Sequence, residues 1–485
     1  MVFKDRLITI IIMICLVTFT GGIVNAATDV QINGRSVTKI IDWGDVLNKP
    51  TIDQDLSESS PNAIQNQAVT QALQTINAPN VEQLSYGIQF DITDPTLECT
   101  RVGNPVLHQL LPVQSAMKGV LLDDNGEITA YLPANDWTTA TRDGSAGQVM
   151  VEIPQFYRRV TISGNIVDVR ISAVPIEGFI EVPRHYVGAY EAALDRTNLK
   201  LCSVVNSSTQ YRGGANTAAW DDTYRSLLGM PATNLLLEYL RTYARNRKPN
   251  STEWNCDVYW SYREIFWLYT IEYANFNCNE AYNAQPDANG YHQGGLGVTN
   301  LALLEWNTHN SYSPYIPCGI SDHLGNNSGV VDYTITKSNN ETQTVSVNRY
   351  RGIESIFGHI LKLLDGILIV KEEDGSDVEY KMYTADEPSL FSSSDITNYI
   401  DVGNISPNTG WIKSIVMGNK GEIMPASVGG SSSTFYCAYH EINITGLGYV
   451  AVGAVRYASF LTSRVFNRTS YTYNGTRLCF LPNNR

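Results

Sequence analysis

This chain of 485 residues has few charged side chains and lacks the common motifs of catalysis and metal binding. Charged residues make up 17% of the chain, the formal net charge is −14, and the seven histidines are dispersed. No strongly basic segment offsets the negative charge, which argues against nucleic acid as a partner. No HExxH helix, GxSxG elbow or phosphate-binding glycine loop occurs in the sequence. We therefore expect a non-enzymatic protein without a metal or a cofactor.

The cysteines show no metal-binding pattern. Of the eight, Cys15 lies in the apolar N-terminal segment, and the other seven are scattered without a CxxC pair. An odd number of cysteines leaves at least one thiol free or in an intermolecular bridge. The sequence allows a disulfide between Cys437 and Cys479 as one alternative. We expect most of the seven cysteines to be small buried side chains.

The one long apolar segment lies at the N-terminus. Lys4 and Arg6 precede an almost wholly apolar run over residues 7–24, and Val24-Asn25-Ala26 fits a small-x-small cleavage site. Residues 1–26 are therefore predicted to be a secretion signal, with an uncleaved membrane anchor as the alternative. No later segment is long and apolar enough to span a bilayer. We expect a secreted or cell-surface protein that meets the membrane only through this signal segment.

Residues 27–85 are polar and have few aromatic side chains. Residues 28–41 alternate like an edge strand, with a turn at Asn33-Gly34. Residues 55–76 follow a helical period, but their apolar stripe is too thin to support a monomeric domain. This pattern predicts a stalk in which copies of the chain pack on one another, with a trimer favoured. A flexible linker is the alternative.

The rest of the chain is too long for one compact core, so more than one domain is expected. Residues 86–181 read as a β-rich domain. Residues 182–485 contain two helical patterns, at residues 233–247 and 260–276, followed by short strands with turn signals. The sequence therefore predicts an α+β fold for the larger C-terminal region.

The C-terminal segment at residues 456–474 has the composition of a binding surface. Eleven of its nineteen residues are Tyr, Ser, Asn or Arg, and none is acidic. Tyrosine supplies rigid contact area, arginine a planar donor, and serine and asparagine adaptable hydrogen bonds. The segment lies between glycine-containing stretches that read as buried strands, at residues 444–455 and 475–480. We interpret it as a recognition surface, with an ordinary polar hairpin as the alternative.

Several phrases together resemble the receptor-binding tail proteins of gut phages and the variable proteins of diversity-generating retroelements. The phrases are MVEIPQFYRRV (150–160), YVGAYEAAL (186–194), IEYANFN (271–277), YRGIESIFGHILKLLDGI (350–367), GGSSSTFYCAY (429–439) and GTRLCF (475–480). Both groups have a C-type-lectin fold, which is shared with formylglycine-generating enzymes. The chain departs from the pattern at Leu361 and Leu363, where aromatic residues are usual.

The resemblance implies a C-type-lectin-like ligand-binding domain over residues 182–485, whose C-terminal strands display a diversified face toward a cell-surface protein or glycan receptor. On that basis the ligand-facing residues would be Arg456, Tyr457, Ser463, Arg464, Phe466, Arg468, Tyr471 and Tyr473. The buried framework would be Phe460, Leu478 and Phe480. A phage origin would place the protein on the virion tail if the N-terminal signal is not used.

Two other functions share this fold. A formylglycine-generating-type enzyme would need a reactive cysteine pair, and no two cysteines of this chain stand at close spacing. A calcium-dependent lectin is suggested by Gln285-Pro286-Asp287 with Glu305-Trp306-Asn307 downstream. These two tripeptides would supply only part of the six to eight oxygens that calcium requires. We therefore expect the region around Gln285 to be a polar loop.

Overall fold

The computed structural model describes residues 30–32, 35–37, 81–211, 231–297, 316–336, 341–374, 377–454 and 457–483. The chain divides into two units, Met1–Ala78 and Pro79–Arg485. In the first unit, β1 (Val30–Ile32) and β2 (Arg35–Val37) pair antiparallel on either side of the predicted turn. The predicted secretion signal and stalk helix lie outside the described residues. No helix within the described ranges is long and apolar enough to cross a bilayer.

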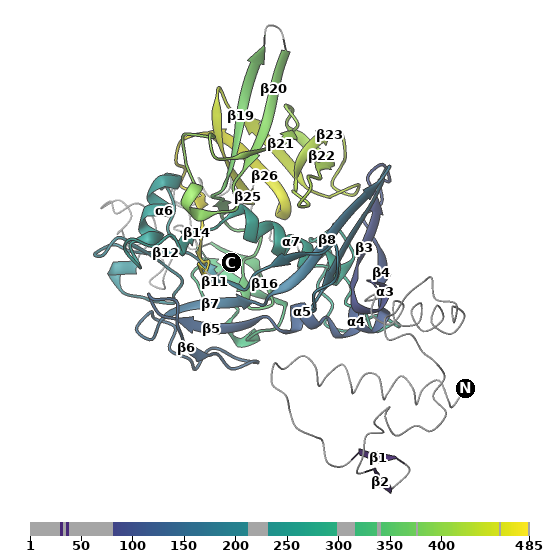
Figure 1. The fold of residues 1–485 in the computed structure, drawn as a ribbon. Coiled ribbons are helices and arrows are strands. Elements are labelled where there is room, and N and C mark those ends of the chain that lie inside the picture. The colour runs from purple at the N-terminus through teal and green to yellow at the C-terminus, as the bar shows by residue number, and fades with distance from the viewer. Residues whose placement is uncertain are drawn as a thin grey trace, which may run out of the picture. The chain divides into compact units, whose positions relative to one another are not determined.

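The second unit is mostly β-strand with few helices (Figure 1). A five-stranded sheet contains, in spatial order, β10 (Ile180–Val182), β8 (Phe156–Ser163), β9 (Ile166–Ser172), β3 (Tyr86–Asp91) and β4 (Thr100–Gly103). A six-stranded sheet contains β14 (Trp254–Cys256), β28 (Arg477–Phe480), β11 (His185–Glu191), β7 (Gln148–Ile153), β5 (Lys118–Leu122) and β6 (Ile128–Tyr131). Because β7 and β11 pair directly, the domain boundary predicted between residues 181 and 182 runs through this sheet.

A ten-stranded sheet forms the part of the unit that carries the C-terminal segment. Its main path is β21 (Ile400–Asn404), β20 (Asp377–Thr384), β19 (Ile367–Asp374), β25 (Leu447–Gly453), β26 (Ser459–Asn467), β24 (Tyr439–Asn443), β22 (Gly410–Val416) and β23 (Met424–Val428). Two short strands, β18 (Leu361–Leu363) and β27 (Asn474–Gly475), join it beside β25. The β19–β20 hairpin projects from the body of the unit (Figure 1).

Smaller elements fill the connections between the sheets. The strands are β12 (Ala193–Asp195), β13 (Lys200–Cys202), β15 (Gly329–Thr336), β16 (Thr342–Tyr350) and β17 (Ile353–Glu354). The short helices are α3 (Val81–Leu84), α4 (Pro105–Leu110) and α5 (Pro112–Ser115). Asn104 caps α4, because its side chain accepts a hydrogen bond from the backbone of Val106.

Both predicted long helices are confirmed, as α6 (Leu237–Arg245) and α7 (Tyr259–Tyr273). Every residue of α7 is buried. The helix lies between the five-stranded and ten-stranded sheets (Figure 1). On one side Trp267 stacks on Phe90 of β3, with ring centroids 6.5 Å apart. On the other side Phe266 packs edge-to-face on Phe460 of β26, which makes α7 the centre of the core.

The burial of α7 includes its charged residues, and each has a partner on another element. Arg158 of β8 donates two hydrogen bonds to Glu264, at 2.6 and 2.9 Å. Arg263 pairs with Glu422 at 3.3 Å. A buried charge without such a partner is strongly unfavourable. The Arg158–Glu264 pair therefore fixes the β8 side of the five-stranded sheet against α7. The Arg263–Glu422 pair does the same for the loop before β23.

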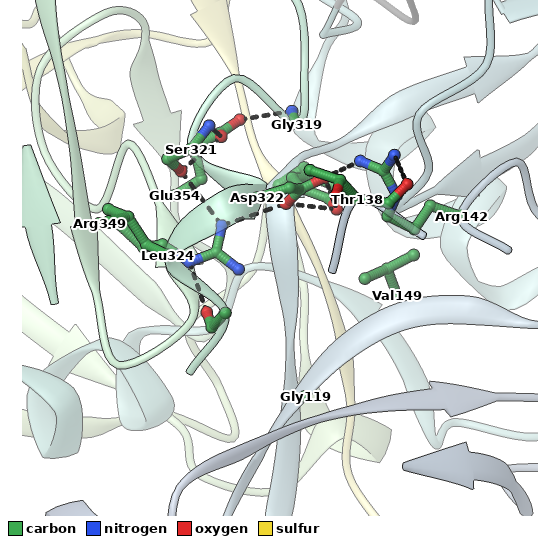
Figure 2. Close-up of polar contacts among 12 residues, drawn as sticks. Gly119, Thr138, Arg142, Val149, Gly319, Ser321, Asp322, Leu324, Arg349 and Glu354 are labelled. Atoms are coloured by element: carbon green, nitrogen blue, oxygen red, sulfur yellow. Dashed lines mark hydrogen bonds and ion pairs between the residues drawn. The ribbon is translucent and has the colours of Figure 1, made fainter. Parts of the chain in front are cut away.

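A second group of buried charges centres on Asp322, which is fully buried (Figure 2). Its carboxylate accepts hydrogen bonds from the phenol of Tyr190 at 2.8 and 2.9 Å and from Arg349 at 3.2 Å. Arg142 also pairs with it. Burial, followed by the neighbouring Asp322 carboxylate, raises the pKa of Tyr190 well above its usual range, so the phenol remains a donor.

Arg349 is linked to a second buried acid, Glu354, through the Ser321 hydroxyl, which accepts from Arg349 Nη1 at 3.1 Å and donates to Glu354 at 2.6 Å. The guanidinium of Arg349 lies over the Trp137 ring at 4.1 Å, and its Nε donates to the carbonyl of Gly325 at 2.8 Å. Glu354 accepts the backbone N–H groups of Gly319 and Ser321, each at 2.7 Å (Figure 2). The two carboxylates therefore hold residues 319–325 against β11, β16 and β17.

We predict that replacing Asp322→Ala lowers the free energy of unfolding by about 3–5 kcal/mol, because it leaves Arg142 and Arg349 without their buried partner. The matched control is Asp332→Ala on β15, where the carboxylate is exposed, and its expected effect is within about 0.5 kcal/mol. Chemical denaturation of the two variants and the parent measures the difference. Equal stability of the D322A and D332A variants would contradict a structural role for this group.

Candidate functional site

The predicted recognition segment begins on β26, which occupies an interior position in the ten-stranded sheet. It pairs antiparallel with β25 and parallel with β24, so that Arg464 lies between Ala451 and Glu441. Neighbouring residues of a strand point to opposite faces of the sheet, and directly paired residues share a face. Over residues 463–466 of β26, Ser463 and Val465 therefore share one face with His440, and Arg464 and Phe466 share the other with Glu441.

Arg464 lies across a pair of stacked tyrosines. The rings of Tyr471 and Tyr473 are parallel to within 7°, with centroids 5.1 Å apart. The Arg464 guanidinium lies 5.2 and 5.4 Å from the two ring centroids, and its Nη1 donates to the Tyr473 hydroxyl at 2.6 Å. Burial raises the pKa of Tyr473, although the arginine opposes the shift. All three side chains are partly exposed and held by one another.

A second aromatic cluster lies on the neighbouring strands. Trp411 of β22 pairs directly with Tyr439 of β24, and Tyr457 packs on both. The centroid of the Tyr457 ring is 4.2 Å from that of Trp411 and 5.8 Å from that of Tyr439. Tyr457 is the most exposed of the three, at 42%. Three aromatic side chains in mutual contact at the surface offer a rigid apolar contact area.

The two clusters are connected by Glu441, whose carboxylate lies 3.5 Å from Arg464. Glu441 is two residues from Tyr439 on β24 and therefore shares its face. We call this surface the aromatic face and define it by Trp411, Tyr439, Tyr457, Glu441, Arg464, Tyr471 and Tyr473. It combines ring faces, hydroxyl groups, one guanidinium and one carboxylate.

Arg468 is placed just beyond the end of β26. Its side chain is 41% exposed, and Nε donates to the hydroxyl of Tyr449 at 3.2 Å. Tyr449 in turn donates to Glu238 of α6 at 2.6 Å. The hydrogen bond that Arg468 donates to Tyr449 raises the pKa of the Arg468 guanidinium. Arg468 is therefore available to a ligand while being oriented by its neighbours.

Two of the predicted ligand-facing residues are buried, and for them the prediction is wrong. Ser463 is 1% exposed and lies on the core face, where its hydroxyl is 2.9 Å from His440 Nδ1. Phe466 is on the same face as Arg464 but is 2% exposed, because Tyr471 covers it edge-to-face at 5.4 Å. Arg456 lies outside the described residues. The predicted framework residues Phe460, Leu478 and Phe480 are confirmed as buried.

Sequence reasoning missed Trp411 and Tyr439 as members of the site. They lie on strands far upstream of the C-terminal segment, and only the pairing of β22, β24 and β26 brings them to it. Tyr439 ends the phrase GGSSSTFYCAY, which carries the family resemblance, but the resemblance implies no binding role for this residue. The signal that could have identified Tyr439 is its alternation on β24, where Tyr439 and Glu441 lie on the face opposite buried His440.

The tripeptides suggested for calcium binding show no metal site in the described part of the chain. The Asp287 carboxylate accepts the backbone N–H groups of Asn289 and Tyr291, at 2.8 and 2.9 Å, as in a turn. Glu305-Trp306-Asn307 lies outside the described residues. Within the described ranges no group of three or more His, Cys, Asp or Glu side chains is placed to hold a metal ion.

The seven described cysteines form no disulfide with one another, including Cys437 and Cys479. Six of the seven are buried, and Cys99 is partly buried. Burial raises the pKa of six of these thiols, which disfavours the thiolate that cysteine chemistry needs. They are Cys99, Cys202, Cys256, Cys278, Cys318 and Cys437.

No protein-family model matches the sequence, and no curated protein matches it either.

His440 lies directly beneath the aromatic face and supports a prediction of pH dependence. Burial lowers the pKa of His440 to about 4 from an ordinary value of 6.5. Between these values the unfolded chain binds a proton that the folded chain does not. The free energy of unfolding therefore decreases as the pH falls from 6.5 toward 4, by at most about 3 kcal/mol from this residue.

We predict that His440→Gln, whose amide does not titrate, reduces this loss of stability. The measurement is the free energy of unfolding of each protein across that pH range. His108, whose pKa burial also lowers to about 4, accounts for part of the slope that remains. Parallel pH profiles for the H440Q variant and the parent would contradict the prediction.

Proposed function

We propose that this chain is a non-enzymatic receptor-binding protein, an adhesin or a determinant of phage tropism, and that the aromatic face is its binding surface. The observation that carries the proposal is the partly exposed stack of Tyr471 and Tyr473, on the connection between β26 and β27, under Arg464 of the interior strand β26. Tyrosine and arginine are the residue types that dominate measured binding hot spots. The strand β26 holds Arg464 rigidly, and the two tyrosines are held by their contacts with that arginine.

The partner that we propose is a protein or a glycan on a cell surface. Aromatic rings pack on the apolar faces of either one, and the hydroxyl groups with Arg464 supply donors for acceptor oxygens. The neighbouring polar residues Thr469 and Ser470 are partly exposed and would exclude water from the rim of the contact.

The fold that we propose for the second unit is of the C-type-lectin type, and it includes β5 and β7, which precede residue 182 but share the six-stranded sheet with β11. Two long helices, short antiparallel strands and a display of residues from the C-terminal strands support this assignment. Leu361 and Leu363, which depart from the usual aromatic residues, are both fully buried in β18. Export through residues 1–26 and assembly as a homo-oligomer through residues 27–85 belong to the same proposal and rest on sequence pattern alone.

The test of the aromatic face compares two double variants in the full-length chain. Tyr471→Ala with Tyr473→Ala removes the stack, whereas Tyr239→Ala with Tyr243→Ala removes a stacked tyrosine pair on α6 outside the face. We expect saturable binding of the labelled parent protein to a subset of bacterial and glycan-bearing surfaces, weakened at least about tenfold in the first variant only. Flow cytometry and glycan arrays measure it.

Thermal melting of the same variants separates binding from folding. Tyr471 and Tyr473 are partly exposed, so we expect the melting temperature of the first variant to stay close to that of the parent. Two results would refute the proposal for this face: equal binding by both double variants, or a large melting decrease showing that the two tyrosines are core residues.

The resemblance to diversified proteins generates a prediction about natural variation. Substitutions among natural copies of the gene should fall at the partly or fully exposed positions Tyr457, Arg464, Arg468, Tyr471 and Tyr473. They should spare Ser463 and Phe466, which are buried, because side chains there carry the packing of the sheet. Deep sequencing of the 3′ end, together with a search for a near-identical template repeat, measures this. An invariant 3′ end would indicate a binding protein of fixed specificity.

A further inference from the structure

A cavity of about 220 Å³ lies beside the end of β3, and none of the residues that define the aromatic face lines it. Its walls come from β3 and the loop that follows it, from the first residues of β4 and β9, from the chain after α7 and from the loop before β24. This volume is below the range that usually holds drug-sized ligands, so the cavity suits a ligand of few heavy atoms. Its lining includes Phe90, Asp91, Asp94, Glu98, Phe276 and Tyr436.

Three carboxylates line this cavity, and no cationic side chain is among its described lining residues. Asp91 is half-buried, whereas Asp94 and Glu98 are exposed. None of the three forms an ion pair with another described residue. The hydrogen bonds that Thr93 donates to Asp91 lower the pKa of that carboxyl, so it stays ionised at neutral pH. The cavity therefore favours a cationic ligand.

The negative charge is spread around the cavity and is not gathered at one point. Asp91 is the last residue of β3, Asp94 lies in the following loop, and Glu98 forms a β-bridge with Asn275 after α7. Within the described ranges no group of three or more acidic, histidine or cysteine side chains is placed to hold a metal ion. A ligand that matches these carboxylates therefore carries positive charge at more than one position.

The inner wall of the cavity is aromatic. Phe276 packs edge-to-face on Phe90 and on Tyr436, with ring centroids 5.0 and 4.7 Å apart. Aromatic rings attract organic cations and pack on the methylene groups attached to them. The Tyr436 side chain is 3% exposed, and its hydroxyl makes no hydrogen bond to a described residue. A ligand N–H group can supply the missing partner, whereas a quaternary ammonium cannot.

We infer that this cavity binds a small aliphatic diamine or polyamine. The ammonium groups pair with the three carboxylates, the methylene chain packs on the rings of Phe90 and Phe276, and one N–H donates to Tyr436 Oη. A metal ion makes no use of the aromatic wall, and an anion meets three carboxylates without a counter-charge. This inference goes beyond the proposed function and does not depend on the aromatic face being a receptor-binding surface.

The first test removes charge from the mouth of the cavity without changing its shape. Asp94→Asn with Glu98→Gln replaces two exposed carboxylates by amides of the same size. The asparagine oxygen can still accept the backbone N–H of Thr96, as Asp94 does at 2.9 Å. Glu177→Gln with Glu181→Gln is the matched control. It changes the net charge equally, at exposed positions on and just before β10, the opposite edge of the five-stranded sheet from β4.

The probes are putrescine, cadaverine and spermidine, with butylamine and choline as comparisons and magnesium chloride as a competitor, all at constant ionic strength. Isothermal titration calorimetry on the full-length protein measures binding. We expect at least one diamine or polyamine to bind saturably and about tenfold or more tighter than butylamine, which carries one ammonium group. Its affinity should fall about tenfold or more in the D94N/E98Q variant and stay unchanged in E177Q/E181Q.

The second test separates the hydroxyl of Tyr436 from the charges. Tyr436→Phe deletes an oxygen that has no hydrogen-bond partner among the described residues, so the melting temperature should not decrease. We expect the affinity for the diamine to fall about threefold or more, because an N–H loses its acceptor. Binding of choline, which has no N–H group, should not change.

Five outcomes would overturn the inference. They are the absence of saturable binding by every diamine and polyamine, equally tight binding of butylamine, displacement of the diamine by an equal concentration of magnesium, equal losses in the two double variants, and unchanged diamine affinity in both the D94N/E98Q and Y436F variants. Combining Tyr471→Ala with Tyr473→Ala should leave diamine binding unaffected. A loss of diamine binding in that variant would place the amine on the aromatic face, and would also overturn the inference.

Discussion

The need to pair every buried charge constrains the second unit of this protein. Its central helix α7 is buried along its whole length, yet it carries Arg263, Glu264 and Glu272. Their partners come from β8, from the loop before β23 and from the end of β16, so the helix cannot shift against any of these without leaving a charge unpaired. Asp322 acts in the same way on β11 and β16. Apolar packing fills the core, but these ion pairs specify how its layers are aligned.

Buried charges also fix the C-terminal strands next to the candidate binding surface. Arg477 of β28 is buried and donates to the carbonyls of Glu354 and Ser355, which ties the chain just after Tyr471 and Tyr473 to the Asp322 group. Upstream of them, β26 is held by β24 and β25 on its two sides. The stacked tyrosines therefore span a short connection whose two ends are fixed in the core. A surface held in this way loses little conformational freedom on binding, which favours affinity.

The two long helices and the β-rich character could be predicted from sequence, because both depend on local apolar periodicity and composition. The framework residues came from what the family resemblance implies. The members of the aromatic face could be predicted only in part. Arg464, Tyr471 and Tyr473 stand close together in the chain, whereas Trp411 and Tyr439 join them through long-range strand pairing. Simple alternation also fails on β26, since its pairing with β25 is irregular between Ser459 and Ser463 and Tyr471 folds back over Phe466.

The ion pair between Arg464 and Glu441 indicates how the aromatic face can accept a ligand. At 3.5 Å and with both side chains partly exposed, this contact contributes at most about 1 kcal/mol. The stacking of Arg464 on two tyrosines and its hydrogen bond to Tyr473 hold the guanidinium plane independently of Glu441. A ligand oxygen can therefore replace the Glu441 carboxylate while the arginine keeps its orientation. For the binding function that we propose, the formal charge of −14 on the whole chain disfavours strongly anionic partners through long-range repulsion.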